Sequence, residues 1–136
     1  MPKLFDPFTV YKDFFAILKY LPVTLRLAFT AIILGIALGF AIAIIRIKNI
    51  PFLKKFTTFY ISIIRGTPII VQLYVSYFGI PIFLKYLNYY AGTSIKIAAV
   101  PPFIYAATAL SFNQAALHSV TIQSALQAVN HGELEA

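Results

Sequence analysis

Charged residues divide the chain into long apolar runs, and the first run lies between Arg26 and Arg46. Its nineteen residues carry no charge, and at 1.5 Å per residue they reach about 28 Å, close to the thickness of a bilayer's hydrocarbon core. The pattern predicts a membrane-spanning helix over about residues 22–45. Gly35 and Gly39, four residues apart, permit close approach of a neighbouring helix, although glycine is also common in lipid-facing helices.

A second run covers about residues 56–84 and contains one charge, Arg65. It is too long for one straight span, and the sequence Gly66-Thr67-Pro68 predicts a break near residue 66. Threonine caps helices and proline fits the first helical turn, so one helix should end near Arg65 and another should begin at Thr67. An external loop is predicted to follow over residues 85–96.

The third run contains no Asp, Glu, Lys or Arg between Ile97 and Asn130. Its first part, about residues 97–117, is apolar enough to span a membrane. The later part is too polar for lipid, and we expect it to continue the helix on the cytoplasmic side, as segment 118–136. The loop 46–55 has four basic residues and no acid, which predicts a cytoplasmic loop and an extracytoplasmic N-terminus.

Residues 1–20, ahead of the first span, carry apolar side chains at a spacing of three to four, with charged residues between them. This pattern predicts an amphipathic helix lying in the membrane interface. The whole sequence therefore predicts an all-α, polytopic membrane protein with about three transmembrane helices, preceded by an interfacial helix.

The composition excludes an ordinary water-soluble domain. Of the 136 residues, 60% are hydrophobic and 11% are charged, whereas soluble domains have about 45–50% apolar and about 25% charged residues. The net charge of +7 lies in the gaps between apolar runs, so lipid and not nucleic acid is the expected partner. The absence of cysteine excludes disulfides and thiolate catalysis, and no cleavable signal peptide is evident.

Candidate catalytic residues are few. Two histidines and four acids occur without metal-ligand spacing, a nucleophile motif or a phosphate-binding loop, so we expect no enzyme activity, metal or cofactor. An intramembrane enzyme that uses His118 stays open as an alternative. Arg65 is the sharper signal, because a charge at membrane depth costs about 2.5–3.5 kcal/mol and is kept mainly where it faces protein, water or substrate. The other interpretation is that its long side chain reaches the cytoplasmic surface.

Three stretches resemble the membrane subunits of polar amino acid ABC importers. One is Arg65-Gly66-Thr67-Pro68-Ile69-Ile70-Val71-Gln72 followed by Tyr77-Phe78-Gly79-Ile80-Pro81. Residues 21–25 resemble the family's entry into its first span, and residues 124–136 resemble the opening of its cytoplasmic coupling segment, the EAA loop. The resemblance covers residues 21–136 and implies a partial type I ABC transmembrane domain that ends inside the EAA motif.

The resemblance also implies roles for three groups of residues. Those expected to couple the chain to an ATPase are Gly132, Glu133, Glu135 and Ala136, although composition alone favours a solvated chain end for the two glutamates. Those expected to form the packing core and the lining of a translocation path are Arg65, Gly66, Thr67, Pro68 and Gln72. The deepest polar side chains of the third span, which are candidates for lining the pore or for hydrogen bonds between helices, are Asn113 and Gln114.

The implied function is that of a permease subunit in an ATP-driven importer, which forms the path for amino acid uptake across the cell membrane. The implied partners are cytoplasmic ABC ATPase subunits that bind the ATP, a second permease subunit of the same or a related kind, and an extracytoplasmic amino acid-binding protein. Members commonly carry Ala-Tyr, Glu and Arg where this chain has Ala116-Leu117, Val120 and Gln123, so a member's substrate specificity does not transfer.

Length separates the chain from complete members of that family, which continue through two more spans. Residues 1–136 alone are therefore expected not to transport. An alternative from a different class is a small multi-span membrane protein with a structural or assembly role, whose copies would associate through Gly35 and Gly39.

Overall fold

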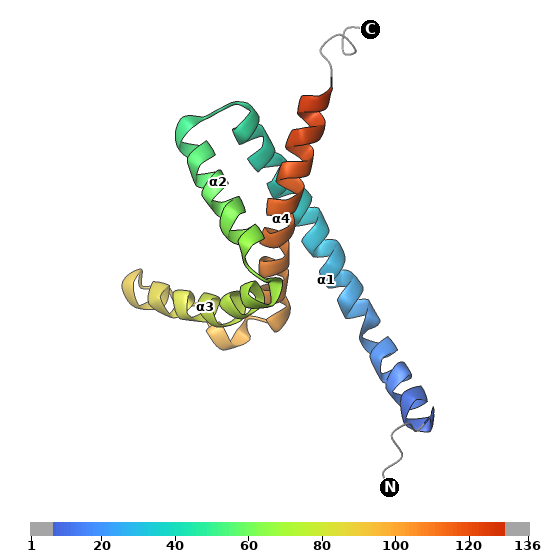
Figure 1. Cartoon of the computed structure of the whole chain (residues 1–136). Helices are drawn as coiled ribbons and strands as arrows, with labels where there is room; N and C mark the ends of the chain where they lie inside the picture. The colour runs from blue at the N-terminus through green and yellow to red at the C-terminus, as the bar shows by residue number, and fades with distance from the viewer. Residues whose placement is uncertain (1–6, 130–136) are drawn as a thin grey trace.

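The computed structural model describes residues 7–129 and consists of helices joined by short connections (Figure 1). In chain order these are α1 (Pro7–Ile47), α2 (Pro51–Gly66), α3 (Ile69–Tyr90), the short 3-10 helix η1 (Ile97–Ala99) and α4 (Pro102–Ala128). No strand occurs within residues 7–129, and the predicted all-α class is confirmed.

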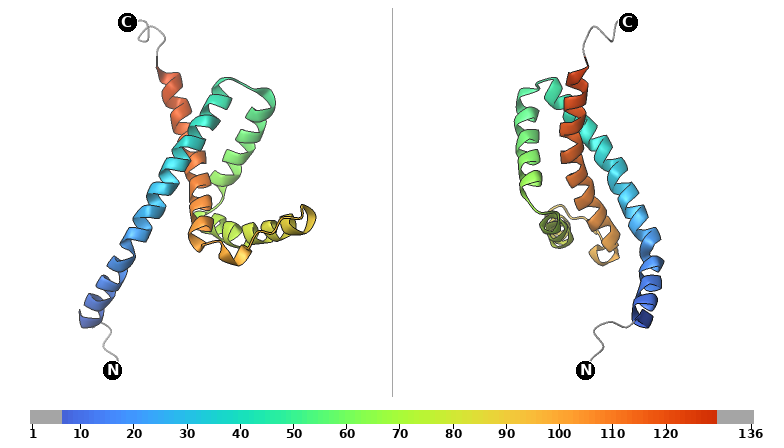
Figure 2. Two further views of the ribbon diagram at one scale, coloured as in Figure 1. Left: turned by 180° about the vertical axis from the view of Figure 1, so that it is seen from behind. Right: turned by 45° about the vertical axis from the view of Figure 1, so that its right-hand side comes forward.

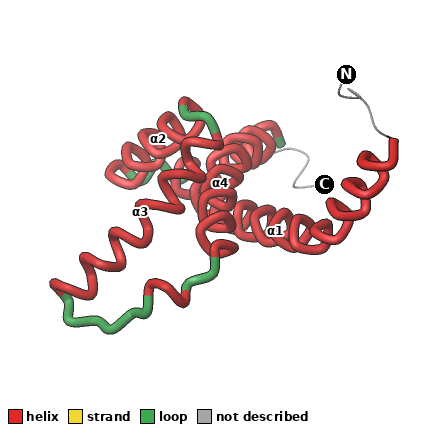
Figure 3. The backbone as a smooth tube through the Cα atoms, turned by 90° about the horizontal axis from the view of Figure 1, so that it is seen from below, coloured by secondary structure: helices red, strands yellow, loops and turns green. Residues whose placement is uncertain are grey.

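Helix α1 joins two segments that the sequence pattern separates. The predicted interfacial helix and the predicted first span form one continuous helix of 41 residues, which at 1.5 Å per residue is about 62 Å long. Pro22 lies inside it and does not end it, because proline removes one backbone hydrogen bond and bends a helix when good helix formers continue on both sides. Seen from below, α1 bends on its way to the N-terminus (Figure 3).

The predicted break near residue 66 is confirmed, but the second helix begins later than expected. Thr67 has extended backbone angles, φ −113° and ψ 138°, and ends α2, while Pro68 precedes the first residue of α3, Ile69. The residue before a proline is pushed out of the helical region by the proline ring, so Thr67 cannot start α3. Its hydroxyl instead donates a hydrogen bond back to the Ile63 carbonyl at 2.9 Å.

Helix α3 lies across the other helices and extends further than predicted (Figure 2). It passes through Pro81 and ends at Tyr90, so the first part of the predicted loop 85–96 is helical. Asn88 then fastens the connection that follows: its Oδ1 accepts hydrogen bonds from Thr93 Oγ1 at 2.7 Å and from Ile95 N at 3.0 Å. Asn88 therefore holds Thr93 and Ile95 in place, which the composition of the loop does not predict.

Helices α1 and α4 form the closest contact in the fold. The buried positions of α1 are small and recur every four residues, at Ala31, Gly35, Gly39 and Ala43. A Cβ on Gly39 would lie 3.1 Å from the Ala115 oxygen and from the Ser119 nitrogen, and a Cβ on Gly35 would collide with Gln114. The close-approach interpretation of the two glycines is confirmed, and because α4 covers both, they are not free to pair two copies of the chain.

The same contacts fix the direction of these helices. Gly35 faces Gln114 whereas Gly39 faces Ser119, so α1 and α4 run in the same direction. The end of α1, the beginning of α2 and the end of α4 therefore lie at one end of the molecule, at the top of Figure 1. The basic loop 46–55 and the segment after residue 118 share this end, as predicted for two regions on one side of a membrane.

Two helices within residues 7–129, α1 and α3, are long and apolar enough to cross a membrane by length and composition. Helix α4, expected as the third span, carries Ser111, Asn113, Gln114 and Ser119, which lower its mean hydropathy. It has more buried residues than any other described helix, so its polar side chains meet protein.

Candidate functional site

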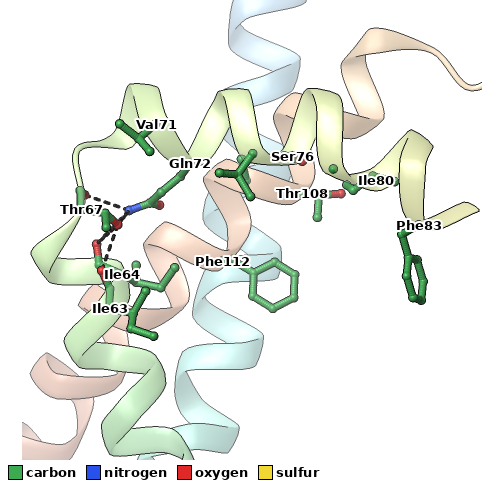
Figure 4. A pocket seen from close by; sticks show the side chains of 13 residues that line it. Ile63, Ile64, Thr67, Val71, Gln72, Ser76, Ile80, Phe83, Thr108 and Phe112 are labelled. Atoms are coloured by element: carbon green, nitrogen blue, oxygen red, sulfur yellow. Dashed lines mark hydrogen bonds between the residues drawn. The ribbon is translucent and has the colours of Figure 1, made fainter.

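The break between α2 and α3 is held by one side chain, Gln72. Its Nε2 lies 2.8 Å from the Ile64 carbonyl, 3.0 Å from the Thr67 carbonyl and 3.0 Å from Thr67 Oγ1 (Figure 4). The last carbonyls of a helix have no partner inside the helix, so Gln72 satisfies acceptors that the end of α2 exposes. The spacing of five positions between Thr67 and Gln72 therefore lets the Gln72 amide reach the end of α2.

Gln72 also connects the break to α4. Its Oε1 accepts a hydrogen bond from Asn113 Nδ2 at 3.0 Å, across 41 positions of sequence. Side-chain amides commonly hydrogen-bond between helices in membrane proteins. Of the two interpretations offered for Asn113, the contact between helices is the one observed in this conformation. Gln114, the other candidate for lining a pore, lies against Gly35 of α1, away from the break.

An apolar groove of about 430 Å³ lies beside the break. Residues of α2, α3 and α4 line it (Figure 4), and the polar side chains at its wall are Thr67, Gln72, Ser76 and Thr108. Ser76 is buried, and its Oγ donates a hydrogen bond to the Tyr105 carbonyl at 2.7 Å. The groove therefore offers a mainly hydrophobic wall with the side-chain amide of Gln72 at one end.

Arg65 does not join this cluster. Its side chain is exposed and lines a different hollow, of about 520 Å³, together with Arg46, Thr58, Ser62 and Val120. Gly66 has no neighbour within 4 Å of an added Cβ, so close packing does not explain it. The five residues predicted as one translocation core thus divide: Thr67, Pro68 and Gln72 build the break, while Arg65 and Gly66 face another side of α2.

Sequence reasoning missed two hydroxyl groups that connect helices. The Tyr60 hydroxyl donates to the Phe112 carbonyl, and the two rings pack edge to face at 6.2 Å. Ser76 makes the equivalent contact from α3 to α4. Hydroxyls within otherwise apolar runs were a usable signal, because a buried polar group needs a hydrogen-bond partner.

The predicted coupling residues Gly132, Glu133, Glu135 and Ala136 lie outside the described residues. The segment before them is helical up to Ala128, as expected. Within residues 7–129 no group of three or more His, Cys, Asp or Glu residues is placed to hold a metal ion.

Long apolar helices packed through small residues, with a hydrogen-bonded helix break between them, define a polytopic helical membrane protein. No family model matches the chain, but individual proteins do. It is 34% identical over 137 residues to the L-cystine transport system permease protein TcyL of Bacillus subtilis, a match that covers 100% of this chain and 54% of TcyL. It is 32% identical to the octopine transport system permease protein OccM of Rhizobium radiobacter, over 97% of this chain and 52% of OccM.

A solved structure shares the fold. The crystal structure of an amino acid ABC transporter with histidines superposes with a TM-score of 0.62 at 32% sequence identity, over 90% of this chain and 55% of that one. The chain is therefore similar, over nearly its whole length, to permeases of amino acid ABC transport systems. It spans about half the length of the curated relatives it matches. Such relatives are transport components and not enzymes.

Proposed function

We propose that the protein is a permease subunit of an ATP-driven amino acid importer and forms part of the translocation path. The observation that carries this proposal is the similarity to TcyL along the entire chain. The break centred on Gln72 supports it, since a broken helix at membrane depth is tolerated only where it is buried in protein or lines a water-filled cavity.

Helix α4 is the element suited to transmit force in this subunit. It runs without interruption from the outer end, past Asn113, to Ala128, and segment 118–136 would dock onto a cytoplasmic ATPase through Gly132 to Ala136. Movement of that segment would shift α4 as a rigid rod, and the Asn113–Gln72 hydrogen bond would carry the shift to the break. Alternating access requires two such states and a contact that biases them.

The proposed assembly contains ATPase subunits, a second permease subunit and an extracytoplasmic amino acid-binding protein. The ATP is bound by the ATPase, and this chain needs no cofactor of its own. We place the N-terminus outside the cell and the coupling segment in the cytoplasm. The shared location of the basic loop 46–55 and the end of α4 supports this orientation, because positively charged loops are retained in the cytoplasm.

Uptake by the full-length gene product tests the proposal. The protein, co-expressed with its ATPase and binding protein, is reconstituted in vesicles, and ATP-dependent uptake is measured for a panel of labelled amino acids. Glu135→Lys should abolish both uptake and co-purification of the ATPase. Asp13→Lys, the same charge reversal near the other end of the chain, should leave both intact. Uptake and a stable complex in the Glu135→Lys variant would refute the coupling role.

A further inference from the structure

Helix α2 carries a polar, cationic face that the proposed transport role does not use. Lys55, Thr58, Ser62 and Arg65 recur at a spacing of three to four, which places them on one side of a helix. Another face of α2, which carries the buried Thr57 and Ile61, packs into the fold, and three phenylalanines beside the polar face are exposed, with exposed fractions of 80%, 66% and 64% for Phe52, Phe56 and Phe59. A polar face on a membrane helix calls for a polar neighbour.

This face is hollowed by two adjoining cavities. The outer one, of about 700 Å³, opens at the turn between α1 and α2 and includes Lys54 and Lys55. The inner one, of about 520 Å³, includes Arg46 of α1 and Arg65 of α2. Both are lined by Thr58 and Ser62, so they form one continuous feature. We call it the basic groove, lined by Arg46, Lys54, Lys55, Thr58, Ser62 and Arg65.

Two arginines converge in the inner part. Helical side chains lean toward the N-terminus of their helix, and α1 and α2 run in opposite directions on either side of their turn (Figure 1). Arg46 and Arg65 therefore lean toward each other and meet in one cavity. Nε of Arg46 is buried and has no hydrogen-bond partner among the described residues, so the arginine at the wall of the groove has an unsatisfied donor.

No acid neutralises these cations within residues 7–129. Asp13 is the one acid in that range and lies thirty-three positions before Arg46 on the same helix, which corresponds to about 50 Å. Like charges at close range repel, and a guanidinium that is half-buried without an anion, as that of Arg46 is, loses solvation. An anion of about the size of a phosphate would remove both costs, since guanidinium groups bind oxyanions with two parallel hydrogen bonds.

We propose that the basic groove binds the phosphate of an anionic phospholipid from the cytoplasmic leaflet. Two features favour a lipid over a soluble anion: the groove opens at the basic turn, and the exposed phenylalanines of α2 beside it offer a surface for acyl chains. Basic pockets between membrane helices on the cytoplasmic side suit such head groups. The lipid would tie α1 and α2 to Val120 of α4, which lines the same cavity. The inference rests on the orientation proposed above.

Fluorescence quenching by brominated lipids tests this directly. The emission that Phe59→Trp adds, taken as the difference between the full-length variant and the full-length parent protein, reports the lipid beside the groove. The measurement compares brominated phosphatidylglycerol with brominated phosphatidylcholine. Phosphatidylglycerol should bind more tightly by about fivefold or more, the factor expected from one cation close to an anionic head group. Equal binding of the two lipids would overturn the proposal.

Substitutions then distinguish the groove from a diffuse surface charge. Arg46→Gln and Arg65→Gln, made in the Phe59→Trp background, should each remove most of the preference, and Arg65→Lys should restore part of it. Lys48→Gln is the matched control, because Lys48 is exposed at the same end of the molecule and does not line the groove. An equal loss in Lys48→Gln would show general attraction and would contradict a built site.

Competition with soluble anions tests whether the groove binds a lipid head group or a free anion. Millimolar inorganic phosphate or glutamate should leave the quenching unchanged, and displacement by either would assign the groove to a soluble anion and overturn the lipid. Failure of the transport proposal is recognised separately. A protein without ATP-dependent uptake that keeps the arginine-dependent preference would refute the transport role alone. Labelling of a Lys48→Cys variant by a reagent confined to the outside would refute the orientation.

Discussion

The contact between α1 and α4 and the break between α2 and α3 both hold helices together, the first by close packing and the second by hydrogen bonds. In the first, Gly35 and Gly39 bring two backbones together, and the contacts are van der Waals contacts with no room for an added methyl group. In the second, Gln72 and Asn113 connect three helices through hydrogen bonds beside a groove of about 430 Å³. The first region is fixed by shape, whereas the second is held by directional hydrogen bonds.

This difference assigns separate tasks to the two regions. Close packing resists small displacements, because every shift creates overlaps or voids. Side-chain amides can release one acceptor and bind another with little net change in energy. A transporter that alternates between two states needs a rigid body and a place where that body moves against its neighbour. The α1–α4 pair fits the rigid body, and the break fits the moving contact.

The largest effect should come from a methyl group placed in the α1–α4 contact. Gly39→Ala would put a Cβ 3.1 Å from backbone atoms of Ala115 and Ser119, so the two helices would have to move apart slightly, and unfolding should become easier by about 1–3 kcal/mol. Gly79→Ala is the matched control, because the nearest atom to its Cβ is 3.9 Å away and alanine favours a helix by about 1 kcal/mol over glycine. Thermal unfolding in detergent should move in opposite directions for the two variants, and equal shifts would contradict this contact.

The next effect is expected at the break. Gln72→Leu removes the amide that serves Ile64, Thr67 and Asn113, and each hydrogen bond between membrane helices contributes about 0.6 kcal/mol. Stability should fall by about 2 kcal/mol, and reconstituted uptake should fall further than stability alone explains, because the moving contact is lost. Unchanged uptake in a folded Gln72→Leu protein would exclude the break from transport.

A smaller effect belongs to the Gln72–Asn113 pair itself. A double-mutant cycle with Gln72→Leu and Asn113→Leu should give a coupling energy of about 0.6 kcal/mol, the average found for hydrogen bonds between membrane helices. The single variant Asn113→Leu must therefore be measured beside Gln72→Leu and the double variant. A coupling energy near zero would mean that the two amides do not depend on each other in the folded protein.

The sequence predicts the break well and its internal connections poorly. Gly66-Thr67-Pro68 is a local signal, because the proline ring alone forces Thr67 out of the helical region. The partner of Gln72 is Asn113, 41 positions away, and no local pattern selects it. The family resemblance of residues 65–72 grouped Arg65 with Gln72, although the two line cavities on different sides of the break.

Helix boundaries are also difficult to predict from local sequence patterns. Pro22 and Pro81 both lie inside helices, near the boundaries predicted after residues 20 and 84, because a single proline costs one hydrogen bond while the residues on both sides keep their own. The glycines of the first span were correctly singled out as sites of close approach. Their partner, α4, followed only from the three-dimensional arrangement, since the contact joins positions eighty residues apart.

The smallest effect should come from Ser76, the hydroxyl that connects α3 to α4. Ser76→Ala keeps the shape of a buried position and removes the hydrogen bond to the Tyr105 carbonyl. That carbonyl still has its acceptor role within α4, so the loss should be about 0.6 kcal/mol. The control is Ser124→Ala, because Ser124 is a serine at an exposed position of α4. This substitution should leave the unfolding temperature unchanged. A loss at Ser76 as large as that of Gly39→Ala would contradict this ranking. It would show that a single hydrogen bond between α3 and α4 stabilises the fold as much as the close packing between α1 and α4.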